Sequence, residues 1–230
     1  MSLQFHKPTA PSEDVLKQLV DYDVVILMDD SGSMRGSRWR QAVSVMKGVV
    51  KKAIEYDEDG IGIQFLNNNQ RKIVKSVEEV ERLFEGVQPR CSTPLGRRLG
   101  DICNGYLRSL KSAKRKPKRC LIVAITDGVP TDEQQVYAAI KNTANELDRL
   151  GAPLTQLGIQ FVQIGNDGGA AAFLKELDDD LKGTTEGKVG RDIVDTVPYH
   201  GAELTSEELV KILIGAINRK VDNRTQVTVQ

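Results

Sequence analysis

Short apolar runs alternate with amphipathic segments along most of this 230-residue sequence, and this alternation limits the fold more than any other feature. Val24–Met28 and Cys120–Ile125 are near-continuous apolar runs, which is typical of strands buried on both faces of a sheet. Helical spacing of apolar residues follows in Trp39–Ile54 and in Glu133–Leu150, which Gly151 ends. Strands that alternate with helices predict a mostly parallel sheet covered by helices on both faces.

The same patterns predict the remaining elements of a doubly wound, Rossmann-like α/β domain. Pro94 suits the first position of a helix that runs to Leu110, with Thr93 as its N-cap. The closing helix is expected over Thr205–Val221. The domain is expected to span residues 22–222, between an N-terminal extension (1–21) and a C-terminal tail (223–230). The other predictions are strands at Gly60–Leu66, Leu157–Ile164 and Ile193–Val197, a short antiparallel edge strand at Arg71–Val74, and helices at Val77–Phe84 and Ala170–Leu181.

Charge and cysteine content narrow the class of protein. The 32 basic and 32 acidic residues balance, so the chain has no overall attraction to nucleic acid. No apolar run has the length of a membrane span. The three cysteines form no CxxC pair, and the first residues lack the pattern of a secretory signal. The sequence therefore predicts an intracellular protein, cytoplasmic or nuclear, with reduced thiols.

Two of the predicted strands run directly into oxygen-bearing side chains. Asp29 ends the first strand and Asp127 follows the central one, so both carboxylates belong at the carboxyl edge of the sheet, where ligands of such folds bind. Ser31 and Ser33 lie on the loop that leaves the first strand, and Thr93 adds a further hydroxyl. Helix capping would explain Asp29 or Ser31 individually, but it does not explain the whole set.

These side chains share one coordination chemistry. Carboxylates and hydroxyls are hard oxygen donors, and the set contains neither imidazole nor thiolate. Such donors suit Mg²⁺ or Mn²⁺ and also accept Ca²⁺. A divalent cation would balance two carboxylates that otherwise repel each other at an apolar strand end. The sequence therefore predicts a magnesium site, with manganese and calcium as the alternative ions.

The five residues resemble a known motif set. Asp29-Asp30-Ser31-Gly32-Ser33 matches the DxSxS motif of von Willebrand factor A (vWA) domains. Thr93 in "STPLGRRL" and Asp127 in "ITDG" match the other two parts of that family's metal-ion-dependent adhesion site. The resemblance extends from about Tyr22 to Val221. One departure is the loop before Thr93, which reads Arg90-Cys91-Ser92 where many relatives carry glycine.

The resemblance implies a binding module and not an enzyme. In vWA domains the two serines and the threonine hold the ion directly or through water, and an aspartate or glutamate of a partner protein fills an open coordination position. The family couples this site to a shift of the last helix. Asp30, at the variable position of the motif, is expected either to hold metal-bound water or to point outward.

Two other functions fit part of the pattern. The first is an intracellular vWA scaffold within a larger assembly, with a metal that is structural. The second is a magnesium-dependent enzyme of phosphoryl transfer. The sequence lacks a GxxxxGK[ST] phosphate loop and the GxSxG elbow of hydrolases, which argues against the enzyme.

Overall fold

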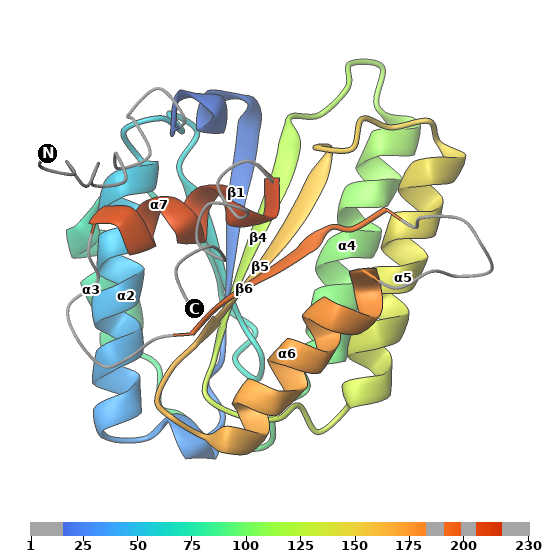
Figure 1. The fold of residues 1–230 in the computed structure, drawn as a ribbon. Coiled ribbons are helices and arrows are strands. Elements are labelled where there is room, and N and C mark those ends of the chain that lie inside the picture. Colours follow the sequence, from blue (N-terminus) through green and yellow to red (C-terminus); the bar gives the residue numbers. More distant parts are fainter. Residues whose placement is uncertain (1–15, 183–190, 199–205, 218–230) are drawn as a thin grey trace, which may run out of the picture.

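A six-stranded sheet forms the centre of the protein, in the order β3-β2-β1-β4-β5-β6 (Figure 1). The computed structural model describes residues 16–182, 191–198 and 206–217. All neighbouring strands are parallel except β2 and β3, which confirms the predicted antiparallel edge. The strands are β1 (Tyr22–Met28), β2 (Ile61–Phe65), β3 (Arg71–Val74), β4 (Arg119–Thr126), β5 (Leu157–Gln163) and β6 (Val194–Pro198).

Helices cover both faces of the sheet, as the alternating pattern predicts. Figure 1 shows α2, α3 and α7 on one side and α4, α5 and α6 on the other. The α-helices are α2 (Ser37–Ala53), α3 (Val77–Glu85), α4 (Leu95–Ser112), α5 (Glu133–Arg149), α6 (Gly168–Lys182) and α7 (Ser206–Ile214). Short 3₁₀ turns are η1 (Lys17–Asp21), η2 (Gly32–Met34) and η3 (Gly215–Ile217).

The central strand β4 shows why this arrangement is stable. Successive side chains of a strand point to opposite faces, and every residue from Cys120 to Thr126 is buried. Leu121 and Val123 join the core beneath α2 and α7, whereas Ile122 and Ala124 join the core beneath α4 and α5. The continuous apolar run at Cys120–Ile125 thus reflects a strand covered on both sides.

Three details of the helices differ from the sequence-based expectation. Thr93 does not cap α4, because the N-cap position is Pro94 and makes no side-chain cap bond. The carboxylate of Asp132 caps α4 instead, with its oxygens 3.0 and 2.8 Å from the backbone nitrogens of Gly96 and Arg97. The closing helix ends at Ile214 and continues as η3, and residues 218–221 of the expected helix lie outside the described residues.

The segment before β1 also contributes to the core. Leu16 and Leu19 are both buried, at 1% and 0% exposure, although they belong to the expected N-terminal extension. Both lie in the cluster that includes β1 and α2. The packed unit therefore begins before Tyr22 in the structure. Within the described residues, no helix is long and apolar enough to cross a bilayer.

Candidate metal centre

The carboxyl edge of β1 and β4 brings the two predicted aspartates together. The chain leaves β1 toward β2 on one side, and β4 lies on the other side, so a topological switch point separates β1 from β4. Met28 pairs with Ile125, and the backbone N–H of Asp29 donates to the carbonyl of Ile125 at 2.9 Å. This register places Asp29 beside the β4 residues Thr126 and Asp127.

Asp29 is held by donors on both of its oxygens. The Ser31 backbone N–H donates to Oδ1 at 2.8 Å, and the Thr126 hydroxyl donates to Oδ2 at 2.7 Å. Burial raises the pKa of Asp29 from 3.8 to about 6, bonds from Thr126 and Ser31 oppose the rise, and the nearby charge of Asp127 adds to it. A positive ion beside this carboxylate would relieve the cost of its charge.

A chain of hydroxyls connects the two ends of the motif. The oxygens of Ser31 and Ser33 are 2.9 Å apart and hydrogen-bonded, and Ser33 Oγ donates to Asp127 Oδ1 at 2.8 Å. Ser31 and Asp127 are buried, whereas Ser33 is exposed. The cluster is therefore anchored in the protein and open to solvent at Ser33.

Thr93 lies on a loop that is tied to both halves of the cluster. Its backbone carbonyl accepts the N–H of Thr131, which follows β4, at 3.0 Å. Two residues earlier, the carbonyl of Cys91 accepts the N–H of Gly32 at 3.0 Å. Thr93 itself is 7% exposed. The structure thus joins the Thr93 loop to the serine loop and to the segment after Asp127.

Cys91, in the loop before Thr93, has a left-handed backbone conformation. Cys91 has a φ of 68°, and it is the one non-glycine residue with positive φ among the described residues. Glycine adopts this left-handed conformation without strain, whereas other residues incur roughly 1 kcal/mol or more. The hydrogen bond from the Gly32 N–H to the Cys91 carbonyl helps to hold the loop in this conformation.

Asp30 serves the loop structure, and it does not point outward. One carboxylate oxygen accepts the backbone N–H of Asn67 at 2.7 Å, and the other accepts that of Asn68 at 2.9 Å. Its carbonyl also accepts the N–H of Arg90 at 2.7 Å. Asp30 therefore connects the serine loop to the β2–β3 loop and to the Thr93 loop.

Arg38 is a member of this cluster that the sequence patterns did not reveal. Its Nη1 lies 2.6 Å from Asp127 Oδ2, and Asp127 is fully buried while the Arg38 side chain is 35% exposed. One sequence signal could have indicated it. Acidic side chains are favoured in the first turn of a helix, but the first turn of α2 has none and contains Arg38 and Arg40.

The donor set fits a hard divalent cation. The side-chain oxygens of Ser31, Ser33 and Asp127 are linked by hydrogen bonds, and Asp29 accepts the Ser31 backbone N–H. The Thr93 loop is bonded to both sides of this cluster. Carboxylate and hydroxyl oxygens are the ligands that Mg²⁺ and Mn²⁺ accept in proteins.

Comparison with known proteins gives a family. The model of the von Willebrand factor type A domain matches residues 23–182, which is more than half of the chain. The chain belongs to the von Willebrand factor type A family. Members of this family are protein-interaction modules that are often metal-dependent. A comparison with curated proteins found no match.

A solved structure supports the fold of this vWA domain. The crystal structure of manganese-loaded TRAP protein from Plasmodium vivax superposes with a TM-score of 0.52. The two proteins are 15% identical, and the match covers 86% of this chain and 74% of the other. At this level of identity the likeness concerns the fold alone.

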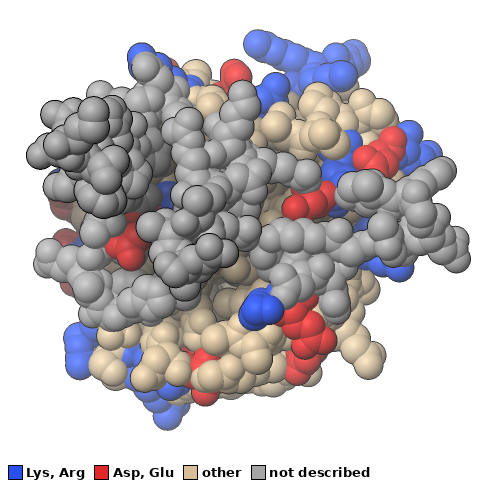
Figure 2. Space-filling model, in the orientation of Figure 1, with Lys and Arg blue, Asp and Glu red and all other residues tan. Residues whose placement is uncertain are grey.

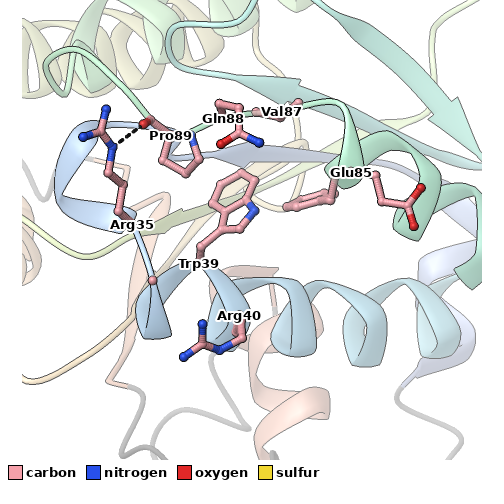
Figure 3. Close-up of a pocket in the computed structure, with 9 residues that line it drawn as sticks. Arg35, Trp39, Arg40, Glu85, Val87, Gln88 and Pro89 are labelled. Carbon is pink, nitrogen blue, oxygen red and sulfur yellow. Dashed lines mark hydrogen bonds between the residues drawn. The ribbon is translucent and has the colours of Figure 1, made fainter.

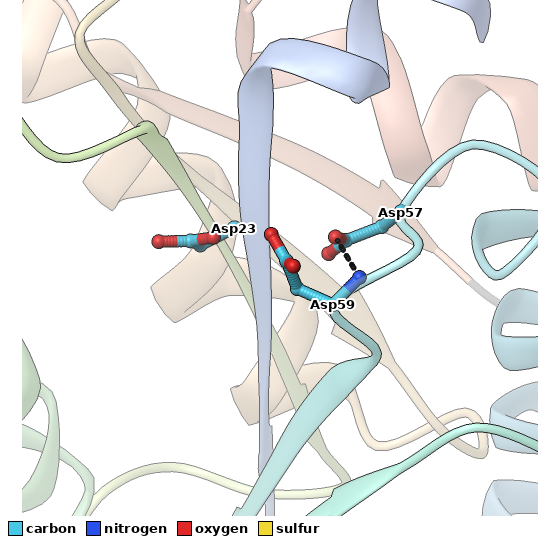
Figure 4. A group of neighbouring side chains, drawn as sticks. All are labelled: Asp23, Asp57 and Asp59. Carbon is cyan, nitrogen blue, oxygen red and sulfur yellow. Dashed lines mark hydrogen bonds between the residues drawn. The ribbon is translucent and has the colours of Figure 1, made fainter.

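The vWA domain has a second acidic cluster at the opposite edge of the sheet, which the sequence patterns did not indicate. Carboxylate oxygens of Asp23, Asp57 and Asp59 lie within 4.8 Å of one another (Figure 4). Lys118 lies 3.2 Å from Asp57 and 2.6 Å from Asp59. Burial raises the pKa of Asp23, and Lys118 opposes that rise. One ammonium group thus already balances one of the three carboxylates in this cluster.

Basic side chains gather at the same edge. The loop between α4 and β4 is exposed at Lys114, Arg115 and Lys116, and Figure 2 shows it as a blue projection at the top of the molecule. These three side chains are therefore exposed to solvent between the end of α4 and the start of β4. This loop lies at the amino end of β4, whereas Asp127 follows the carboxyl end of the same strand.

A pocket lies between the start of α2 and the segment that follows α3 (Figure 3). Trp39, near the start of α2, packs on Phe84 of α3 with ring centroids 5.0 Å apart. Arg35 and Arg40 also line the pocket, and Arg35 Nε donates to the carbonyl of Pro89 at 2.9 Å. These two arginines therefore differ from Arg38, which bonds Asp127.

Proposed function

We propose that this vWA domain is a non-catalytic interaction module that binds a divalent cation, Mg²⁺ in the first place. The residues that would hold the ion are Asp29, Ser31, Ser33, Thr93 and Asp127. An aspartate or glutamate of a partner protein would complete the coordination of the ion. The observation that carries the proposal is that hydrogen bonds hold these residues together: the Ser31 backbone N–H donates to Asp29, the two serine hydroxyls bond each other, and Ser33 Oγ donates to Asp127.

The chemistry of the donors supports a role in binding. Neutral hydroxyls take little charge from a cation, so a cation held partly by Ser31, Ser33 and Thr93 keeps its attraction for a further carboxylate. Exposure at Ser33 gives a partner access to this side of the cluster. The bound ion would supply electrostatic attraction for that carboxylate, and the loops would fix its position.

Calorimetric titration with MgCl₂ and MnCl₂ tests the proposal. Ser33→Ala removes one exposed hydroxyl, and Asp29→Ala with Ser31→Ala removes a larger part of the donor set. Asp59→Asn is the matched control, because it changes an acidic residue of the second cluster at the opposite edge. We expect saturable binding at one site, weakened by the first two variants and unchanged in the control.

The same titration tests whether a carboxylate from a partner completes the coordination of the ion. Acetate or a glutamate-containing peptide should tighten metal binding to the unaltered protein, because it supplies the remaining ligand. If Asp59→Asn loses metal binding and Ser33→Ala retains it, the metal binds at the second cluster and not at the proposed site. Absence of binding with and without the acidic ligand would contradict the proposal and favour the scaffold function.

A further inference from the structure

Both oxygens of the Asp127 carboxylate are engaged in the structure. Ser33 donates to Oδ1 at 2.8 Å, and Arg38 lies 2.6 Å from Oδ2. Asp127 is fully buried, so its charge has little access to water. A charge buried in this way is stabilised mainly by its partners, and among the described residues the Arg38 guanidinium is the positively charged group in contact with it.

The fold holds Arg38 in place from two sides. Arg38 extends from the first turn of α2, and the loop after β5 lies against it. In that loop Gly165 has a φ of 75°, and a Cβ atom built there would lie 3.3 Å from Arg38 Nε. The guanidinium is therefore packed between Asp127 and the backbone of the β5–α6 loop.

Helix stability does not explain an arginine at this position. The amino end of a helix carries partial positive charge, so cations in the first turn are unfavourable there. An exposed arginine on α2 would gain nothing from this location. The contact with Asp127 offsets the repulsion, which indicates that Arg38 belongs to the aspartate cluster.

We propose that Arg38 is a positioning residue that lowers the affinity of this site for divalent cations, and so makes tight metal binding depend on the partner's carboxylate. This inference rests on the proposed metal site. The guanidinium neutralises one of the two carboxylates and repels a cation placed near them. A partner carboxylate brings back a negative charge, so ion and partner bind cooperatively.

Arg38→Met tests this role, because methionine keeps much of the aliphatic length and removes the charge. Arg38→Lys keeps the charge, and Arg40→Met removes a neighbouring charge that does not contact Asp127. Mn²⁺ and Mg²⁺ affinities are measured by calorimetry, with and without acetate. Circular dichroism in chelator checks that each variant is folded.

We expect Arg38→Met to bind Mn²⁺ and Mg²⁺ about tenfold more tightly than the unaltered protein, which corresponds to about 1.4 kcal/mol. Arg40→Met and Arg38→Lys should stay within about twofold of the unaltered protein. The tightening by acetate should be smaller in Arg38→Met, because the charge that acetate offsets is gone.

Two results separate the failure of this inference from the failure of the proposed function. If the unaltered protein binds the ion and Arg38→Met binds it equally or more weakly, the role of Arg38 is wrong while the metal site stands. If neither protein binds a divalent cation with or without acetate, the proposed function is wrong, and the role of Arg38 is wrong with it. Binding of the ion by Arg38→Met but not by the unaltered protein would support the inference most strongly.

Discussion

Asp29→Asn should make the protein more stable at neutral pH in the presence of chelator, although it removes a proposed metal ligand. The Asp29 carboxylate is 1% exposed, and burial raises its pKa from 3.8 to about 6. Asparagine has nearly the same shape and is uncharged at every pH. The substitution removes the cost of a buried negative charge and leaves the volume of the site unchanged. The amide oxygen can still accept the Ser31 N–H, whereas the Thr126 hydroxyl loses its carboxylate acceptor and has the Gly128 carbonyl at 3.4 Å. That loss does not depend on pH, so the difference between pH 4 and pH 7 isolates the effect of the charge.

The size and direction of the change in the free energy of unfolding follow from the pKa of Asp29. Folded Asp29 holds its proton more tightly than the unfolded residue, so the unaltered protein loses stability as pH rises from 3.8 through about 6. At 1.36 kcal/mol per pKa unit, the full loss is about 3 kcal/mol. For a domain of this size, that loss corresponds to a decrease in Tm of about 6–12 °C.

Urea unfolding followed by circular dichroism measures this effect at pH 4 and pH 7. Chelator is present because a bound cation would stabilise the charged carboxylate. Each variant is compared with the unaltered protein at the same pH, which cancels the titration of the other groups. The stability advantage of Asp29→Asn should be small at pH 4 and larger by about 2–3 kcal/mol at pH 7.

Asp59→Asn is the control for this experiment, because its pKa shift has the opposite sign. The Lys118 hydrogen bond and charge lower the pKa of Asp59, so that carboxylate stabilises the fold above its unfolded pKa and loses the contribution at low pH. Relative to the unaltered protein at the same pH, Asp59→Asn should therefore not gain stability as pH rises. An Asp29→Asn advantage that is equal at pH 4 and pH 7, or smaller at pH 7, would refute the reasoning.

Three further substitutions test the loops and the helix contact around the site. Asp132→Ala removes the carboxylate that caps α4 and should lower the free energy of unfolding by about 1–2 kcal/mol in urea titrations. Gly96→Val places a Cβ 2.5 Å from the backbone nitrogen of Val136. This overpacking should destabilise the protein by about 1–3 kcal/mol or more and lower its Tm. An unchanged Tm would contradict this close contact. Asp30→Ala leaves the partly buried N–H groups of Asn67 and Asn68 without their acceptor and should destabilise the protein by about 1–3 kcal/mol in urea, a loss that added Mg²⁺ does not selectively restore.

Sequence patterns predicted the order and kind of the elements because this information is local. The period of the apolar residues distinguishes strand from helix within each segment. Cys120–Ile125 is apolar at every position, and β4 is indeed covered on both faces. The edge strand Arg71–Val74 was predicted at the observed residues. The closing helix was harder to delimit, because its apolar spacing continues through Gly215–Ile217, where the structure forms a 3₁₀ turn.

The candidate site was predictable in part for the same reason. Asp29 and Asp127 each follow a predicted strand, and parallel strands present their carboxyl ends at one edge. Their approach therefore required only the inference that β1 and β4 are neighbours. Whether the five oxygen-bearing residues bind a cation stays a prediction, and the metal titration tests it.

The sequence by itself determined which segments are buried strands and which residues follow them, since apolar periodicity and chain order contain both. Only the tertiary structure decided that Asp132 caps α4, that Asp30 connects three loops and that Arg38 lies on Asp127. Each of these contacts joins loops or helix ends that are far apart in the sequence. Their geometry depends on how the helices pack on the sheet, and no local pattern of residues specifies that packing.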